Sequence, residues 1–266
     1  MKRILMMLFL GVMIAAPVFG QTPKPADAPK ADDKMKAAPK PAEATQAMPS
    51  ADQIIEKYVQ AIGGKAAIEK ASSRVTKGTF EIPAMGATGP IEIYAKAPNK
   101  TVMIITFPGF GTIQQGYNGQ VGWAQEPTSG LRELSGAELA SAKREAEFFG
   151  MLKMKELYPK MSVTGKQKVG NGDSYVVELT PAEGKPEKWY FDVQTGLLTR
   201  VDVEVDSPQG NIPFEVYLED YREVEGLKMP FTIRRTSPAI SFTIRLEEVK
   251  NNVAIDDVKF NKPAGQ

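Results

Sequence analysis

The sequence predicts an α+β protein built on one curled antiparallel sheet of about ten strands, an unclosed half-barrel with helices packed on its concave face. Three observations lead to this prediction. From residue 75 onward, most segments alternate apolar and polar side chains with a period of two, as half-buried strands do. Short turns rich in Gly, Asn and Asp separate these segments, which favours hairpins between neighbours in the chain. Only the stretches 51–62 and 134–157 have clear helical spacing, and they are available to fill the hollow of the sheet.

The composition excludes several classes of function. The chain of 266 residues has 33 basic and 32 acidic side chains, a net charge of +1 that gives no general attraction to nucleic acid, so we expect no nucleic-acid partner. It contains no His and no Cys, which excludes nucleophilic catalysis based on either residue, disulfides and ordinary zinc sites. We therefore expect a protein that is not an enzyme and that needs no cofactor and no metal, since catalysis would have to rely on carboxylates, Lys, Tyr or Ser alone. We also expect a monomer.

The first fifty residues are predicted to lie outside the folded domain. Lys2 and Arg3 precede the apolar run 4–16, and the pattern predicts a signal peptide over 1–20 that is cleaved after Gly20. An uncleaved anchor is the alternative, but the run is short for a membrane span. Residues 21–50 are rich in Ala, Pro and Lys and contain no aromatic residue, which is typical of a linker. We expect a periplasmic or secreted protein with one β domain over 51–266.

The domain begins with a helix. Ser50 and Gln53 have the spacing of a capping box, and apolar residues follow along one side of 54–62. Gly63 and Gly64 should end this helix.

The strands come next, in two groups. The segment 101–107 is apolar on both faces, which indicates a strand covered on two sides. Asn118 and Gly119 predict a hairpin with a two-residue turn that would place Trp123 opposite Gln114. Strand-like patterns, which we interpret as about ten strands, occur at 75–82, 91–96, 101–107, 110–117, 120–125, 163–169, 175–179, 189–191, 197–205, 212–218, 231–233 and 240–246.

Between the two groups of strands lies a helical stretch, 134–157. Ser135 and Glu138 have the spacing of a second capping box, and Gly150 is expected to end or bend the helix. Beyond Gly150 the segment is apolar nearly all round, so it is either ordinary core, the more common case, or a lid over a lipid-sized cavity.

Several short motifs resemble a known family. They are Ala61 to Ala67, Tyr117 to Gly119 leading to Trp123, Trp189 to Asp192 leading to Leu198, and Gly226 to Phe231. Over about 51–263 the chain resembles the bacterial lipoprotein carrier and receptor family (LolA and LolB), and more specifically the outer-membrane-lipoprotein-sorting-like domains of secreted proteins. The resemblance implies an unclosed β-barrel whose groove between sheet and helices holds acyl chains. It assigns no functional residue in this chain.

A site for acyl chains needs a dry concave surface, adaptable side chains such as Met, and a movable cover. We expect the helical residues to face Val102, Ile104 and Trp123, or else Trp189 and Phe191. The predicted ligand-binding residues are Val102, Ile104, Trp123, Phe148, Phe149, Met151, Leu152, Met154, Trp189 and Phe191. The function expected is non-enzymatic binding of lipid or of a lipoprotein acyl chain. The alternative is a tethered module with a fully packed core that docks other envelope proteins.

Overall fold

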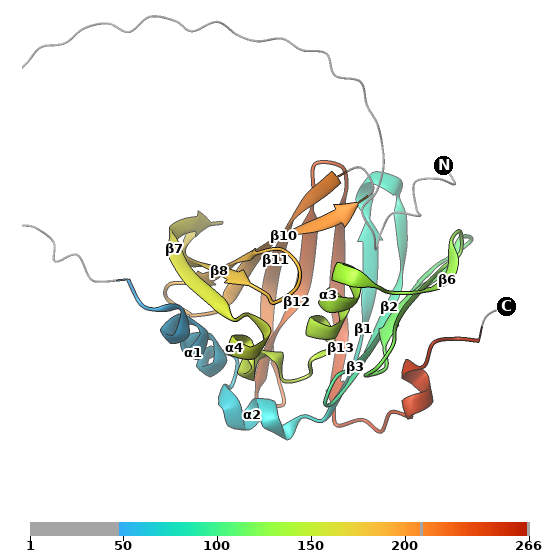
Figure 1. Cartoon of the computed structure of the whole chain (residues 1–266), viewed down its shortest axis with the longest axis horizontal. Helices are drawn as coiled ribbons and strands as arrows, with labels where there is room; N and C mark the ends of the chain where they lie inside the picture. Colours follow the sequence, from blue (N-terminus) through green and yellow to red (C-terminus); the bar gives the residue numbers. More distant parts are fainter. Residues whose placement is uncertain (1–47, 208–209, 265–266) are drawn as a thin grey trace, which may run out of the picture.

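The computed structural model describes residues 48–207 and 210–264, which form one antiparallel sheet with helices inside its curve (Figure 1). The predicted signal peptide, and residues 21–47 of the predicted linker, lie outside the described residues. The α+β class and the unclosed, curled sheet are confirmed. The sheet has thirteen strands, somewhat more than the sequence suggested.

The order of the strands in the sheet is β6-β5-β4-β3-β2-β1-β13-β12-β11-β10-β9-β8-β7. The chain therefore meanders from the middle to one edge, crosses to the opposite edge, and meanders back until β13 pairs with β1. The strands are β1 (Ser73–Ile82), β2 (Ala87–Lys96), β3 (Lys100–Phe107), β4 (Gly111–Tyr117), β5 (Gly122–Glu126), β6 (Gly130–Glu133), β7 (Lys160–Val169), β8 (Gly172–Thr180), β9 (Glu187–Asp192), β10 (Leu198–Ser207), β11 (Gly210–Val224), β12 (Leu227–Thr236) and β13 (Ser241–Asn251).

The crossing between the two edges, residues 134–159, contains the helices predicted for that stretch. The helical elements of the chain are α1 (Ala51–Ala61), α2 (Gly64–Lys70), η2 (Pro83–Met85), α3 (Gly136–Ala146), η3 (Gly150–Leu152), α4 (Met154–Leu157) and η4 (Asp257–Phe260). Because β6 and β7 are the outermost strands, a connection on the concave side has to span the hollow of the sheet. We call residues 134–159 the crossing segment.

The start of α1 follows the prediction. The Gln53 amide donates to Ser50 Oγ at 3.3 Å, and the Ser50 amide donates to Gln53 Oε1 at 2.8 Å, so the capping box is present. The chain turns at Gly63, where φ is 123° and an added Cβ would lie 2.2 Å from the Gly226 carbonyl oxygen. Only glycine fits this contact between the end of α1 and the β11–β12 turn.

The start of α3 differs from the prediction. Ser135 occupies the N-cap position, but its side chain accepts no capping hydrogen bond. Glu138 instead accepts two bonds from Arg132 of β6, at 2.8 and 2.7 Å. A bidentate ion pair is stronger than a neutral capping bond, which explains why Glu138 binds Arg132 instead of completing the capping box. The helix also ends earlier than expected, at Ala146, because Glu147 has extended backbone angles.

The hairpin at Asn118 also differs from the prediction. Gly116, not Gln114, lies opposite Trp123, and Tyr117 pairs with Gly122, so the loop is longer than two residues. Asn118 Oδ1 accepts from the amides of Gln120 and Val121 at 3.0 and 2.8 Å, which fixes this wider loop. The new register places the Trp123 ring over Gly116, where an added Cβ would lie 2.7 Å from it.

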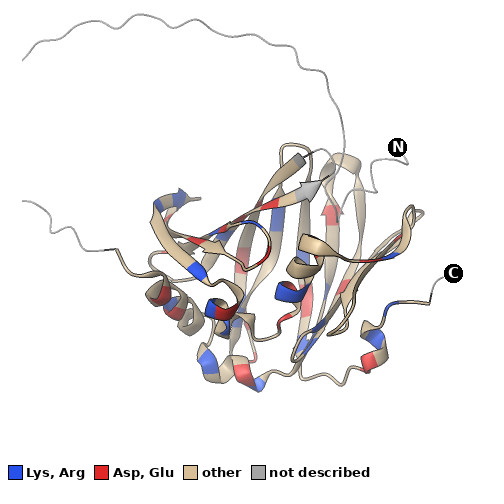
Figure 2. Cartoon of the chain, in the orientation of Figure 1, with Lys and Arg blue, Asp and Glu red and all other residues tan. Residues whose placement is uncertain are grey.

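The two faces of the sheet have different covers. On β3 the side chains of Ile105 and Phe107 face the concave side, whereas Val102 faces the convex side and packs with Phe260 of η4. The prediction of a strand covered on both faces is confirmed for this strand. Charges of both signs are spread over helices and strands (Figure 2).

Candidate functional site

The concave face of the sheet has one half that is closed by helices. We call it the covered half; it consists of the concave side chains of β7, β8 and β9 and the helices α1, α2, η3 and α4 above them. Val177 and Leu179 are fully buried there, and Phe191 is 1% exposed. The Tyr58 ring of α1 lies 5.4 Å from the ring of Phe191. This half is a packed core.

The neighbouring strands β10 to β13 carry a second set of apolar side chains on the same face. We call this set the apolar strip; its members are Val201, Val203, Phe214, Val216, Leu218, Ile233 and Ile244. They lie directly opposite one another across the strands, as in the pairs Val201–Val216 and Ile233–Ile244. Every member is only half-buried. The strip is therefore a continuous apolar surface that the helices cover incompletely.

Helix α3 lies within the curve of the sheet (Figure 1), and its apolar side faces β5 rather than the strip. Its apolar residues Leu139 and Ala142 contact Ala124 of β5 and Leu134. The Arg132–Glu138 pair fixes the same end of α3 to β6. On this side the helix is attached to the sheet edge rather than to the strip.

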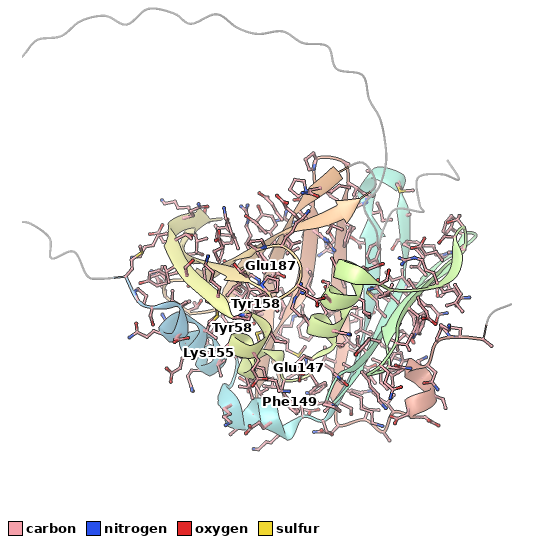
Figure 3. All side chains as sticks on the ribbon, in the orientation of Figure 1. Tyr58, Glu147, Phe149, Lys155, Tyr158 and Glu187 are labelled. Atoms are coloured by element: carbon pink, nitrogen blue, oxygen red, sulfur yellow. The ribbon has the colours of Figure 1, made fainter. Side chains whose placement is uncertain are left out.

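On the other side, the crossing segment is held by Glu187 of β9. Tyr158 Oη donates to Glu187 Oε2 at 3.0 Å, and Trp189 Nε1 donates to the same oxygen at 2.9 Å. Arg144 of α3 approaches Glu187 Oε1 at 3.5 Å and donates to the Glu183 carbonyl at 2.8 Å. Figure 3 shows Tyr158 and Glu187 side by side. Burial, and then the charge of Glu187, raise the pKa of Tyr158, so this tyrosine stays a neutral donor.

Seven of the ten predicted site residues are brought together. Phe148, Phe149, Met151, Leu152, Met154, Trp189 and Phe191 all belong to the cluster of the covered half. Within it, Met154, Trp189 and Phe191 are buried, whereas the other four are half-buried along the crossing segment. The Phe148 amide donates to the Pro98 carbonyl at 2.9 Å, which fixes the segment over the β2–β3 turn.

The other three predicted residues lie elsewhere. Val102, Ile104 and Trp123 form a separate cluster with Phe260 on the convex face. Trp123 Nε1 donates to the Phe260 carbonyl at 3.1 Å, so the C-terminal segment covers it. The first of the two expected arrangements, with the helix facing these residues, is therefore not formed. The cause is the two-residue period of β3, which turns Val102 and Ile104 away from the concave side.

The sequence-based prediction included neither Arg235 nor Glu145 in the site. Arg235 lies on β12 two residues after Ile233, so strand alternation turns it toward the concave face. Glu145 is the residue of α3 whose charge acts on Arg235. Its side chain is accessible to solvent, yet surrounding protein raises the pKa of its carboxyl. A carboxylate that points into the hollow of a curled sheet has both properties. The signal in the sequence was one basic residue at an inward position of an otherwise apolar strand face.

A hollow of about 440 Å³ opens beside the start of α1, lined by Ile54, Lys57, Tyr175, Phe191 and neighbouring residues. Lys57 Nζ donates to the carbonyls of Val193 and Gln194 at 2.6 and 3.1 Å, so its charge is engaged in holding the β9–β10 turn against α1. Two residues of the covered half, Ile54 and Phe191, line this hollow. The Lys57 ammonium is not free to bind a ligand there, because it holds the β9–β10 turn.

No helix among residues 48–207 and 210–264 combines the length and apolar character needed to cross a bilayer. The same residues contain no group of three or more acidic side chains arranged to hold a metal ion.

Comparison with known proteins gives a likeness of structure. No family model and no curated protein matches the sequence. A LolA superfamily protein from Nitrosomonas europaea superposes with a TM-score of 0.55 at 16% identity, over 81% of this chain and 99% of that one. A DUF1329 family protein from Desulfovibrio piger ATCC 29098 gives 0.54 at 14% identity, over 79% and 96%.

An outer membrane lipoprotein-sorting protein domain from Vibrio parahaemolyticus gives a TM-score of 0.53 at 12% identity, over 79% of this chain and 95% of that domain. The resemblance expected from the sequence motifs is thus confirmed at the level of the fold. The chain has the fold of the LolA superfamily and lipoprotein-sorting structures.

Proposed function

We propose that the protein is a non-enzymatic envelope protein that binds a lipophilic ligand, a lipoprotein acyl chain or a lipid, on the concave face of its sheet. The observation that carries the proposal is the apolar strip, whose members are half-buried beneath the crossing segment while α3 packs on β5. A contiguous apolar surface left partly open is a feature of binding sites rather than of finished cores. The fold shared with LolA superfamily structures supports the same conclusion.

The energetic requirement is met by most of one acyl chain. Each methylene moved from water into apolar surroundings contributes about 0.8 kcal/mol. About fifteen buried methylenes therefore contribute roughly 12 kcal/mol, which leaves enough for binding near the micromolar range after an association cost of about 4 kcal/mol.

The proposed site also uses residues of the crossing segment. Phe148, Phe149, Met151 and Leu152 are half-buried at the border between the covered half and the strip, and we propose that they touch the ligand. Met154, Trp189 and Phe191 would support them from behind. Val102, Ile104 and Trp123 are not part of this proposed site, because they lie on the convex face.

The proposed location follows from the sequence alone. We propose that the signal peptide 1–20 directs export, that residues 21–50 tether the domain, and that the domain 51–266 acts in the periplasm or outside the cell.

The test is binding of an environment-sensitive fluorescent fatty-acid probe to the chain from residue 21 onward, with competition by unlabelled lipid. We expect saturable binding near one probe per chain. Ile233→Gln should weaken it about tenfold, because a polar amide replaces apolar contact within the strip. Thr232→Gln is the matched control, since Thr232 lies opposite Glu219 and Arg245 on the convex face.

Two results would contradict the proposal. One is the absence of probe binding to protein that unfolds cooperatively in urea. The other is an equal loss of binding in the Ile233 and Thr232 variants. Either result would favour the alternative, a packed domain that docks another envelope protein.

A further inference from the structure

Arg235 is the one basic residue that interrupts the apolar face of β12. Its partners across the sheet are Val216 on β11 and Phe242 on β13. Its guanidinium carbon lies 4.1 Å from the centre of the Phe214 ring and 5.8 Å from that of Phe242. The two rings hold the guanidinium on the concave face, within the apolar strip.

The donors of Arg235 are unused. Its Nε is buried and has no hydrogen-bond partner. A guanidinium has five N–H donors, and among the described residues Arg235 forms no side-chain hydrogen bond and no ion pair within 4.0 Å, although its charge interacts at longer range with Glu145. Burial accordingly lowers the pKa of Arg235 from its usual value. A buried cation without an anionic or hydrogen-bonding partner costs free energy, and binding an anion would remove that cost.

The adjacent residue on β12, Arg234, does have a carboxylate partner. Arg234 points to the convex face, where its Nη2 lies 2.9 Å from Glu219 Oε1. Its guanidinium also lies 4.1 Å from the centre of the Tyr217 ring. Both arginines stack on an aromatic ring, and only Arg234 has a carboxylate partner. The free donors are therefore specific to the concave site.

Glu145 does not supply the missing partner. Its Oε1 accepts a hydrogen bond from Ser141 Oγ at 3.0 Å, and it forms no close ion pair with Arg235. Surrounding protein raises the pKa of the Glu145 carboxyl, while the hydrogen bond from Ser141 and the charge of Arg235 act in the opposite direction. Glu145 therefore acts on Arg235 only at longer range, and the N–H donors of Arg235 remain free to bind a ligand.

We propose that Arg235 binds the anionic head group of the ligand, a carboxylate or phosphate, while the acyl chain lies along the apolar strip. The inference rests on the proposed function and names its ligand class, an anionic amphiphile. The planar fork of a guanidinium matches two oxygens of one oxyanion. Val216 lies directly opposite Arg235, and Ile233 lies two residues away on the same face, so apolar surface begins beside the charge.

The test uses a neutral environment-sensitive probe and three competitors with one alkyl chain: the fatty acid, the primary alcohol and the alkyl phosphate. We expect the acid or the phosphate to displace the probe at least about tenfold more strongly than the alcohol. The comparison of acid with phosphate identifies the head group. Arg235→Gln should lose the preference while still binding the alcohol within about twofold, and Arg235→Lys should keep part of it.

Arg234→Gln is the matched control and should keep the full preference. Equal displacement by acid and alcohol in the unaltered protein would overturn this inference and leave the proposed function standing. A preference that survives Arg235→Gln would also overturn it. If no probe binds to the folded protein, the proposed function itself fails, so the two failures are distinguishable.

Discussion

The covered half and the apolar strip belong to the same antiparallel sheet, yet only one of them is a finished core. In the covered half, α1 brings Ile54, Ile55, Tyr58 and Val59 onto β7 to β9, and side chains such as Val177 become fully buried. Over the strip, none of the described helices presents an equivalent apolar face, because α3 directs its apolar residues to β5. The alternation of residues along the strands makes both surfaces apolar. Whether such a surface becomes closed core or a partly open binding surface depends on the helix that packs over it.

Topology explains why the two halves differ. The crossing segment has to join β6 at one edge of the sheet to β7 at the other. Its last part, η3 and α4, reaches the covered half and packs there, whereas α3 places its apolar residues against β5 and reaches β9 through Arg144. One connection therefore completes the core at one end and spans the strip at the other.

The largest expected effect is a difference in stability between the two halves. Phe191→Ala, in the covered half, should lower the free energy of unfolding by about 3–5 kcal/mol, since it leaves a cavity in a closed core. Phe214→Ala, in the strip, should lower the free energy of unfolding clearly less than Phe191→Ala, because the Phe214 side chain is only half-buried. Urea unfolding monitored by tryptophan fluorescence measures both. Equal losses would show that the strip is packed as tightly as the covered half.

The second effect concerns the attachment of the crossing segment. Glu187→Gln removes the charge that accepts hydrogen bonds from Tyr158 and Trp189 and pairs with Arg144, each contact being well shielded. Hydrogen bonds to charged groups contribute about 1.5–3 kcal/mol, so we expect a loss in that range. Hydrogen exchange should quicken within 136–158 while strands β1 to β4 keep their protection.

Asp52→Asn provides the control for that experiment. Asp52 also pairs with the crossing segment, through Lys155 at 2.9 Å, but both side chains are mostly exposed. An exposed pair contributes about 0–1 kcal/mol. If the Asp52 and Glu187 variants loosen the segment equally, Glu187 is not its main anchor.

Much of the fold could be predicted because its signals are local. The capping box at Ser50, the glycines after α1 and the alternating strands depend on residues near one another in the sequence, and all three are present. The capping box at Ser135 was predicted by the same rule and is absent, because Arg132 binds Glu138 instead. Local rules fail where a neighbouring strand offers a stronger partner.

The site was predicted only in part for a related reason. Phe148 to Met154 do meet Trp189 and Phe191, since the crossing segment has to pass that end of the sheet. No local pattern shows that η4 returns to cover Val102 and Trp123 on the convex face. Arg235 could have been noticed, because it occupies an inward position in a strand, but its lack of a partner is visible only in three dimensions.

A smaller effect on stability is expected at Glu145, whose contribution should depend on pH unlike that of ordinary surface acids. Its raised pKa means that the folded state holds the proton more tightly than the unfolded state does. Stability is then lost as pH rises from the unfolded value of about 4.3 through the raised folded value. Glu145→Gln should be more stable than the unaltered protein near neutral pH and equal to it in acid. Urea midpoints across this range test the sign, and a variant less stable at neutral pH would contradict it.

The smallest effect lies on the convex side, where Asp257 of η4 holds the C-terminal segment. Its carboxylate accepts from Lys100 and Lys96, each at 2.7 Å, and these bonds lower its pKa to about 2. A lowered pKa stabilises the folded state above the ordinary Asp value, and this contribution disappears as pH falls through the folded value. Asp257→Asn should therefore lower the urea midpoint slightly at neutral pH and not near pH 2. Because η4 covers the face opposite the strip, ligand binding should be unchanged in this variant. A variant that binds the probe less well would show that the two faces of the sheet are coupled.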